Sequence, residues 1–304
     1  MIYLVILSIL LITFFKIPPH WSILIGITLS LSFSSAPRLT KTVKNLGSRI
    51  LQLSIILLGA SLNFHSVIRE GMGGLILTFF SISIVFLFGH FLARFFGLTS
   101  PLSTLITAGT SICGGSAISA ISPVLKADSL TMATALGIVF ILNAVSVFIF
   151  PPIAHFANFT QLQFGTWAAL AIHDTSSVVA ASQLYGEEAL KVGATLKLTR
   201  ALWIIPLSIL FSYIKKTDSK MPVPWFILFF MMNSILFTFV SDLHFLIPYF
   251  SMFSKTGLSL TLFLVGLSLN KQQIKQIGKS PVFFGLSLWI ISLLGSFFYV
   301  KYYV

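Results

Sequence analysis

Eleven apolar stretches make up most of this chain, and the charged residues lie chiefly in the short segments that connect them. An α-helix needs about 20 predominantly apolar residues to cross a bilayer. Only 9% of the residues are charged, whereas a soluble globular domain carries roughly 25%. The alternating segments of a membrane β-barrel are absent from the sequence. The pattern therefore predicts an all-α polytopic membrane protein with about eleven transmembrane helices, at 2–15, 20–36, 46–63, 73–93, 101–122, 129–154, 164–184, 189–213, 223–241, 255–270 and 281–300.

The distribution of basic residues predicts the orientation of these spans. With the N-terminus in the cytoplasm, eleven of the 19 Lys and Arg residues fall in cytoplasmic loops, six fall outside and two lie within a span. Cytoplasmic loops are enriched in Lys and Arg, so this distribution favours a cytoplasmic N-terminus. The net charge of +12 comes from these loops and does not indicate a nucleic acid as partner. No basic segment precedes residues 2–15, which we interpret as a retained span and not a cleaved signal peptide.

Residues 107–120 form a run of small side chains in the middle of the fifth span. Twelve of these fourteen residues are small and none is charged. Glycine weakens a helix by about 1 kcal/mol relative to Ala, and irregular backbone at membrane depth must be buried in protein or line a polar cavity. The run predicts a broken helix whose backbone N–H groups face a substrate, as in transporters. The alternative is a helix whose small residues let another helix cross closely. The candidate substrate-binding residues here are Ser111, Cys113, Gly114, Gly115 and Ser116.

The seventh span carries a histidine and a carboxylate side by side. His173 and Asp174 are followed by Thr175 and Ser176, with apolar residues on both sides. Ionisable residues inside a membrane are costly and mark transport pathways or proton relays, and histidine can titrate near neutral pH. These four residues are candidates for coupling transport to protons or sodium, or for contacting the substrate. The alternative is that His173 and Asp174 satisfy each other or a neighbouring helix.

Two cations lie one turn apart in the eighth span. Lys197 and Arg200 are spaced i, i+3 and therefore share a helix face. Lys197 could extend its amine toward the outer end of the span, whereas Arg200 lies deeper. Asp174 is the only carboxylate clearly within a span, so the two cations leave a positive excess in the core. The excess favours a small anion as substrate, bound by Lys197 and Arg200.

Other chemistry has no support in the residues. Cys113 is the single cysteine, so no intrachain disulfide can form. The six histidines show no metal-ligand spacing, and no phosphate-binding loop, zinc motif or pair of catalytic carboxylates occurs. We therefore expect no enzyme activity, no metal and no cofactor. Asn63, Asn143 and Asn270 are expected to form hydrogen bonds between helices.

Three motifs, taken in order, resemble the signatures of the YeiH-type membrane proteins, a bacterial family labelled as sulfate exporters. They are Cys113–Ile118 with Pro123-Val124, then Gly165–Ala181, then Lys197–Arg200. The resemblance implies a multi-pass protein of the bacterial inner membrane, related in fold to cation/proton antiporters and bile-acid symporters. Such proteins have two inverted five-helix repeats with crossing broken helices. This chain departs from the family pattern after His173, where Asp174 and Thr175-Ser176-Ser177 replace Glu and Val-Ala-Gln.

The implied repeats divide the chain into three parts. These are an additional transmembrane helix at 1–18, a first inverted repeat at 19–158 and a second at 159–304. This arrangement pairs the fifth span with the tenth and makes Gly257 to Gly266 the second broken helix. A weak internal match of residues 47–71 with 254–278 pairs the third span with the tenth instead.

Together these features predict a secondary active transporter of a small anion, such as sulfate or a related oxyanion, coupled to protons or sodium. One alternative is a cation/proton antiporter that uses Asp174, with Lys197 and Arg200 as internal counter-charges. Another is a passive anion channel. The expected partners are the lipid bilayer, the anionic substrate, a coupling proton or sodium ion and, in a homodimer, a second copy of the chain.

Overall fold

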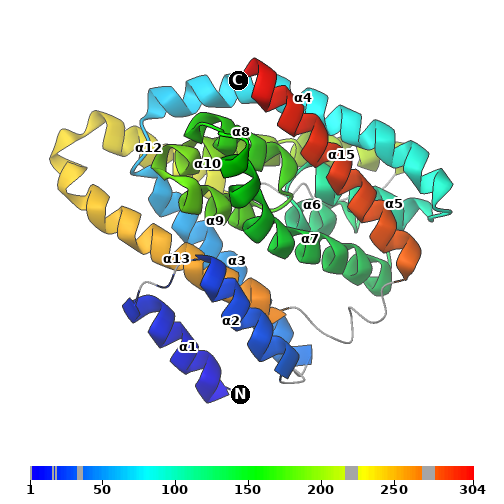
Figure 1. Ribbon diagram of the computed structural model, residues 1–304, viewed down its shortest axis with the longest axis horizontal. Helices are drawn as coiled ribbons and strands as arrows, with labels where there is room; N and C mark the ends of the chain where they lie inside the picture. Colours follow the sequence, from blue (N-terminus) through cyan, green and yellow to red (C-terminus); the bar gives the residue numbers. More distant parts are fainter. Residues whose placement is uncertain (1, 16, 18, 33–36, 216–224, 269–277) are drawn as a thin grey trace. The chain divides into compact units, whose positions relative to one another are not determined.

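The computed structural model describes residues 2–15, 17, 19–32, 37–215, 225–268 and 278–304. This described part of the chain is helical and contains no strand (Figure 1). The elements, in chain order, are α1 (Ile2–Phe15), α2 (Pro19–Ser32), α3 (Pro37–Gly59), α4 (Phe64–Phe95), α5 (Ser100–Ser111), α6 (Gly115–Ile121), α7 (Ser129–Phe156), α8 (Gln161–Ala171), α9 (Thr175–Tyr185), α10 (Glu187–Ala201), α11 (Ile204–Lys215), α12 (Trp225–Phe239), the 3₁₀ helix η1 (Ser241–Leu246), α13 (Ile247–Ser268) and α15 (Lys279–Tyr303).

Among the described residues, five helical segments are long and apolar enough to cross a membrane. They are Gly71–Phe95, Leu130–Phe156, Glu187–Lys215, Ser241–Leu267 and Lys279–Tyr303. Shorter apolar helices occur at Val5–Phe15, Trp21–Ser30, Leu46–Gly59 and Trp225–Phe239. Large apolar side chains such as Phe80, Leu87 and Phe91 are exposed along α4, and so extended an apolar surface is unfavourable in water. These features fit a membrane protein, while the number of eleven spans stays a prediction.

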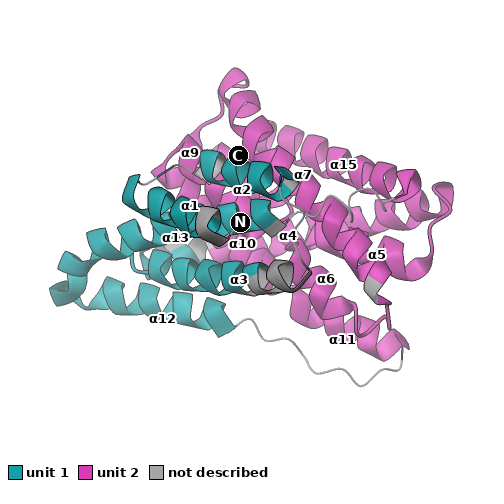
Figure 2. Cartoon of the chain, turned by 90° about the horizontal axis from the view of Figure 1, so that it is seen from below, with its two compact units in different colours: residues 1–70, 224–271 teal, residues 71–223, 272–304 magenta. Residues whose placement is uncertain are grey.

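The chain packs as two compact units, and each takes residues from distant parts of the sequence (Figure 2). Unit 1 contains Met1–Glu70 and Pro224–Lys271, and unit 2 contains Gly71–Val223 and Gln272–Val304. Each unit draws on both predicted repeats, so neither repeat is a compact body by itself. The predicted internal symmetry and its boundaries stay a prediction.

Unit 1 is built around α13, which packs against α2 and α3. The backbones of α2 and α13 come so close that a Cβ on Gly26 would lie 2.2 Å from the carbonyl oxygen of Phe263. A Cβ on Gly266 would lie 2.4 Å from the oxygen of Ile23. Toward α3, the Ser254 hydroxyl donates to the carbonyl of Ser54 at 2.7 Å. Helix–helix contacts in membranes favour such small residues.

The predicted second break at Gly257 to Gly266 is wrong, because α13 runs without interruption from Ile247 to Ser268. The glycines there serve close packing instead. A Cβ on Gly257 would lie 2.1 Å from the Ser54 hydroxyl oxygen of α3, and Gly266 lies against α2. Asn270, at the end of the predicted tenth span, lies outside the described residues.

Unit 2 contains all the predicted substrate-binding and ion-coupling residues. Trp167 on α8 is fully buried, stacks on Phe150 of α7 with ring centroids 4.3 Å apart, and donates its indole N–H to the Leu293 carbonyl of α15. The N-termini of α7, α8 and α9 are capped by side chains. Asp128 accepts from the Thr131 N–H at the start of α7, and this hydrogen bonding holds the pKa of the Asp128 carboxyl below its usual value. These contacts fix the helices that carry the candidate site.

Candidate functional site

The fifth predicted span is interrupted, as the small-residue run predicts. α5 ends at Ser111 and α6 begins at Gly115. Between them Gly114 has φ +64°, a backbone conformation that glycine adopts far more readily than other residues. A Cβ on Gly114 would lie 3.3 Å from the Cβ of Asp174. The interruption of this span therefore lies directly against the polar segment of the seventh span.

The seventh predicted span is interrupted as well, which the sequence analysis did not predict. α8 ends at Ala171 and α9 begins at Thr175. Asp174 is the N-cap of α9, and its carboxylate accepts hydrogen bonds from the Ser177 N–H and the Ser176 hydroxyl. N-cap carboxylates satisfy first-turn N–H groups that have no partner within the helix. The acidic side chain therefore defines where the second half-helix starts.

Asn143 of α7 supports this second interruption from a third helix. Its side-chain oxygen accepts from the backbone N–H of His173 at 3.1 Å and from that of Asp174 at 3.2 Å. Asn143 is 1% exposed, so water is not available to replace it. The prediction that Asn143 makes hydrogen bonds between helices is confirmed.

The two cations of α10 bind carbonyls at the interruptions, and Arg200 reaches both of them. Arg200 donates from Nε to the Ser111 carbonyl, at the end of α5, and from Nη1 to the Leu170 carbonyl near the end of α8. Lys197 donates to the Ile172 carbonyl at 2.6 Å. Both side chains are fully buried. The last carbonyls of a helix lack intrahelical donors and carry the negative end of its dipole. The two cations therefore supply both the missing donors and the opposite charge.

This geometry changes two expectations about Lys197 and Arg200. Lys197 does not extend to the outer end of its span, since its amine binds carbonyls in the core. The positive excess is also partly offset, because each helix C-terminus carries roughly half a negative charge. Among the described residues no carboxylate forms an ion pair with either cation, and Asp174 directs its carboxylate to Ser176 and the start of α9.

Several buried polar groups near the two interruptions have no hydrogen-bond partner within the described residues. Burial without a partner is costly for such groups, and most in native proteins are satisfied. The alternative that the His173 side chain is satisfied by Asp174 or by a neighbouring helix is wrong, since neither ring nitrogen of His173 is bonded to a described residue. The unpartnered atoms include Arg200 Nη2, His173 Nδ1 and Nε2, Thr110 Oγ1, Asn143 Nδ2 and Ser177 Oγ.

The remaining predicted residues belong to the same two interrupted segments. Ser111 is buried and its hydroxyl donates to the Ala108 carbonyl of its own helix. Cys113 is buried at 2% exposure and its thiol is free. Ser116 is exposed and Gly115 is partly exposed at the start of α6. Thr175 is buried in the first turn of α9. The structure thus brings Ser111, Gly114, His173, Asp174, Lys197 and Arg200 together.

Long apolar helices with buried charge at two interrupted helices define a polytopic α-helical membrane protein. Within that class, this chain belongs to the UPF0324 membrane protein family. Residues 2–296 match the family model described as Conserved hypothetical protein 698. A UPF0324 membrane protein of Porphyromonas gingivalis is 44% identical over 288 residues, which cover 93% of this chain and 86% of the relative.

Two further relatives carry the same name. The UPF0324 membrane protein of Bacteroides thetaiotaomicron is 41% identical over 289 residues, covering 94% of this chain and 87% of the relative. That of Bdellovibrio bacteriovorus is 41% identical over 277 residues, covering 89% and 85%. These names state a membrane location and no substrate. No solved structure matches the chain.

Proposed function

We propose that this protein is a secondary active transporter of a small anion in the bacterial inner membrane. The observation that carries the proposal is that Arg200 hydrogen-bonds to the ends of two half-helices, α5 and α8, where both predicted spans are interrupted. Interrupted helices in membrane proteins mark the binding sites of secondary transporters. Buried ionisable residues inside a membrane mark transport pathways. The resemblance to YeiH-type proteins favours sulfate or a related oxyanion as the substrate.

In this proposal Arg200 has two tasks. Nε and Nη1 hold the carbonyl ends of α5 and α8, and Nη2 has no partner among the described residues. The remaining nitrogen is a donor for one oxygen of an anion, and a guanidinium is well suited to oxyanions. An anion that draws the guanidinium toward itself would weaken both helix-end contacts at once. This would link anion binding to a change in both interrupted helices.

His173 and Asp174 are the candidates for ion coupling. Both ring nitrogens of His173 are buried without a partner, and the Asp174 carboxylate caps α9. A proton or sodium ion taken up by Asp174 would compete with the Ser176 and Ser177 donors for the same oxygens. Uptake of the coupling ion would therefore act on the start of α9, next to Gly114 of the other interruption.

The proposal is tested by measuring sulfate and sulfite flux into proteoliposomes. Arg200→Gln removes the charge and the fork of donors, and we expect at least about a tenfold lower flux, the usual range for losing a charge-assisted hydrogen bond. Lys191→Gln is the matched control, because Lys191 is exposed on the same helix. His173→Asn is the second variant if Arg200→Gln does not fold, since the His173 ring makes no hydrogen bond with a described residue.

Three results would contradict secondary active transport of an anion through this site. The first is flux in an Arg200→Gln, Lys197→Gln double variant equal to that of the unmodified protein. The second is a cation-dependent pH change that needs no anion and is lost in Asp174→Asn, which indicates a cation/proton antiporter. The third is an anion current that does not depend on a proton or sodium gradient, which indicates a channel.

A further inference from the structure

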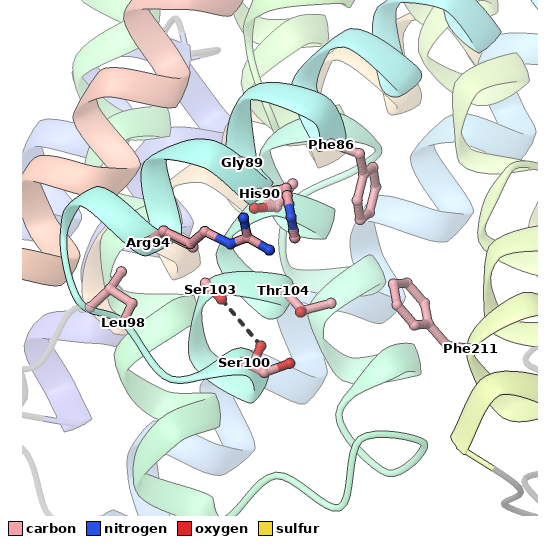
Figure 3. A pocket seen from close by; sticks show the side chains of 11 residues that line it. Phe86, Gly89, His90, Arg94, Leu98, Ser100, Ser103, Thr104 and Phe211 are labelled. Atoms are coloured by element: carbon pink, nitrogen blue, oxygen red, sulfur yellow. Dashed lines mark hydrogen bonds between the residues drawn. The ribbon is translucent and has the colours of Figure 1, made fainter.

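Unit 2 contains a cavity of about 360 Å³ away from the two interruptions, where α4 ends and α5 begins (Figure 3). Its walls come from α4, α5, the turn between them and α11. None of its lining residues is a predicted site residue, although Thr107 begins the small-residue run 107–120. The lining side chains include Phe86, His90 and Arg94 of α4, Thr104 and Thr107 of α5, and Phe211 of α11. The cavity is thus distinct from the site around Arg200.

The polar part of this cavity carries the positive charge of Arg94. His90 and Arg94 lie one turn apart on α4, and both side chains reach toward the hydroxyl of Thr104 across the cavity (Figure 3). None of the eleven lining residues is Asp or Glu. The Arg94 guanidinium makes no hydrogen bond or ion pair within the described ranges, although arginine has five N–H donors. The cavity therefore presents donors and positive charge without a compensating carboxylate.

Two further features narrow the class of ligand. Ser100, the first residue of α5, lines the cavity, and the N-cap Thr99 makes no side-chain cap hydrogen bond. The cavity therefore borders the start of a helix, the end whose dipole favours anions. The opposite wall is aromatic, with the rings of Phe86 and Phe211 at 6.2 Å between centroids. The cavity is larger than a single oxyanion. Its volume leaves room for the remainder of a ligand against the apolar wall.

We propose that this cavity binds an oxyanion group, such as a phosphate or sulfate, through Arg94, His90 and the hydroxyl of Thr104. The group belongs either to a soluble anion or to the headgroup of an anionic lipid, since both present the same oxygens to the guanidinium. The site does not depend on the proposed transport, because its residues are separate from both interruptions.

Ligand binding is tested by measuring how fast a cysteine introduced at the cavity reacts. Ser100 lines the cavity, and the native Cys113 is buried, so Ser100→Cys gives one accessible thiol. Its reaction with a neutral maleimide is timed in nanodiscs of phosphatidylcholine, with sodium sulfate or with sodium chloride at equal ionic strength. The same reaction is then timed in nanodiscs that contain phosphatidylglycerol. The protein without this substitution reports background labelling.

Arg94→Gln and Arg49→Gln, each combined with Ser100→Cys, form the matched pair. Arg49 is exposed on α3 and does not line the cavity. If labelling is slower in sulfate than in chloride for Arg49→Gln but not for Arg94→Gln, the ligand is a soluble oxyanion. If labelling is slower only in nanodiscs that contain phosphatidylglycerol, and Arg94→Gln removes this difference, the ligand is a lipid headgroup. We expect Arg94→Gln to weaken the protection about tenfold or more. Equal rates under all conditions, or equal protection in both variants, would overturn the proposal.

Discussion

At the scale of single residues, Asn143 shows how one side chain maintains an interrupted helix. The N–H groups of His173 and Asp174 cannot bond within α8 or α9, and both donate to the same side-chain oxygen. An amide oxygen has two lone pairs and can accept both. The polar atom is nearly inaccessible to water, so its loss would leave two buried donors unsatisfied.

We predict that Asn143→Leu, which keeps the size of the side chain, lowers the free energy of unfolding by about 2 kcal/mol or more, because each unsatisfied buried donor costs roughly 1–3 kcal/mol. Thermal unfolding of the purified protein followed by intrinsic fluorescence measures the change. Asn63→Leu is the control. Asn63 is exposed and accepts from the His65 N–H at the surface, where water can take its place. Equal midpoints for the two variants would contradict the assigned role of Asn143.

At the scale of elements, glycine has two different consequences in this chain. Gly114 lies at an interruption, with a positive φ, and the local sequence predicts that break. Gly257 and Gly266 lie in the uninterrupted α13, where they allow close contact with α3 and α2. Composition alone does not separate the two cases, because the partner that approaches each glycine comes from a distant part of the sequence.

The second interruption, at 172–174, could not be predicted from glycine or proline, since neither occurs there. It is held by Asn143 of α7 and by the two cations of α10, which are long-range contacts. One local signal was available. Asp174 followed by Thr175-Ser176-Ser177 has the pattern of an N-cap and its first turn, and the structure has Asp174 at that position. The polar pair His173 and Asp174 identified this segment as a candidate site, but did not predict that the helix is interrupted there.

Gly114→Ala and Gly73→Ala are a matched pair at this scale. Alanine at Gly114 must take up φ +64° and place its Cβ 3.3 Å from that of Asp174, so we predict a loss of about 1–3 kcal/mol in stability together with reduced anion flux. Alanine at Gly73, in α4, meets no atom within 4 Å, and we predict a gain of up to about 1 kcal/mol. Thermal unfolding and proteoliposome flux check both variants. Wild-type stability and flux in Gly114→Ala would argue against a required interruption.

At the scale of the whole molecule, the all-α membrane architecture follows from composition and hydropathy, but the grouping into units does not. Unit 1 joins α2 and α3 to α12 and α13, and the pairing of α2 with α13 depends on one close approach at Gly26 and Gly266. A single small residue in each of two helices is common in membrane proteins. The pairing therefore has no distinctive signature in the sequence.

The predicted orientation can be tested in intact bacteria. Ser100, at the start of α5, is predicted to face the cytoplasm, and Glu188, at the start of α10, the outside; both are exposed. A membrane-impermeant maleimide should label Glu188→Cys but not Ser100→Cys, and permeabilised cells should label both. The unmodified chain, whose Cys113 is buried, reports the background. If only Ser100→Cys is labelled in intact cells, the orientation is the opposite of the predicted one.

The approach of Gly26 to Gly266 also determines when unit 1 can be completed during synthesis. α2 leaves the ribosome well before the part of α13 that covers it, because Gly266 follows Gly26 by 240 residues. At about 5–20 residues per second, the α2 surface around Gly26 waits on the order of ten seconds or more for its partner. During that interval it faces lipid, the insertion machinery or other nascent helices. Unit 1 can therefore be completed only after α13 has been made. A chain released before α13 would keep α2 without the helix that it packs against.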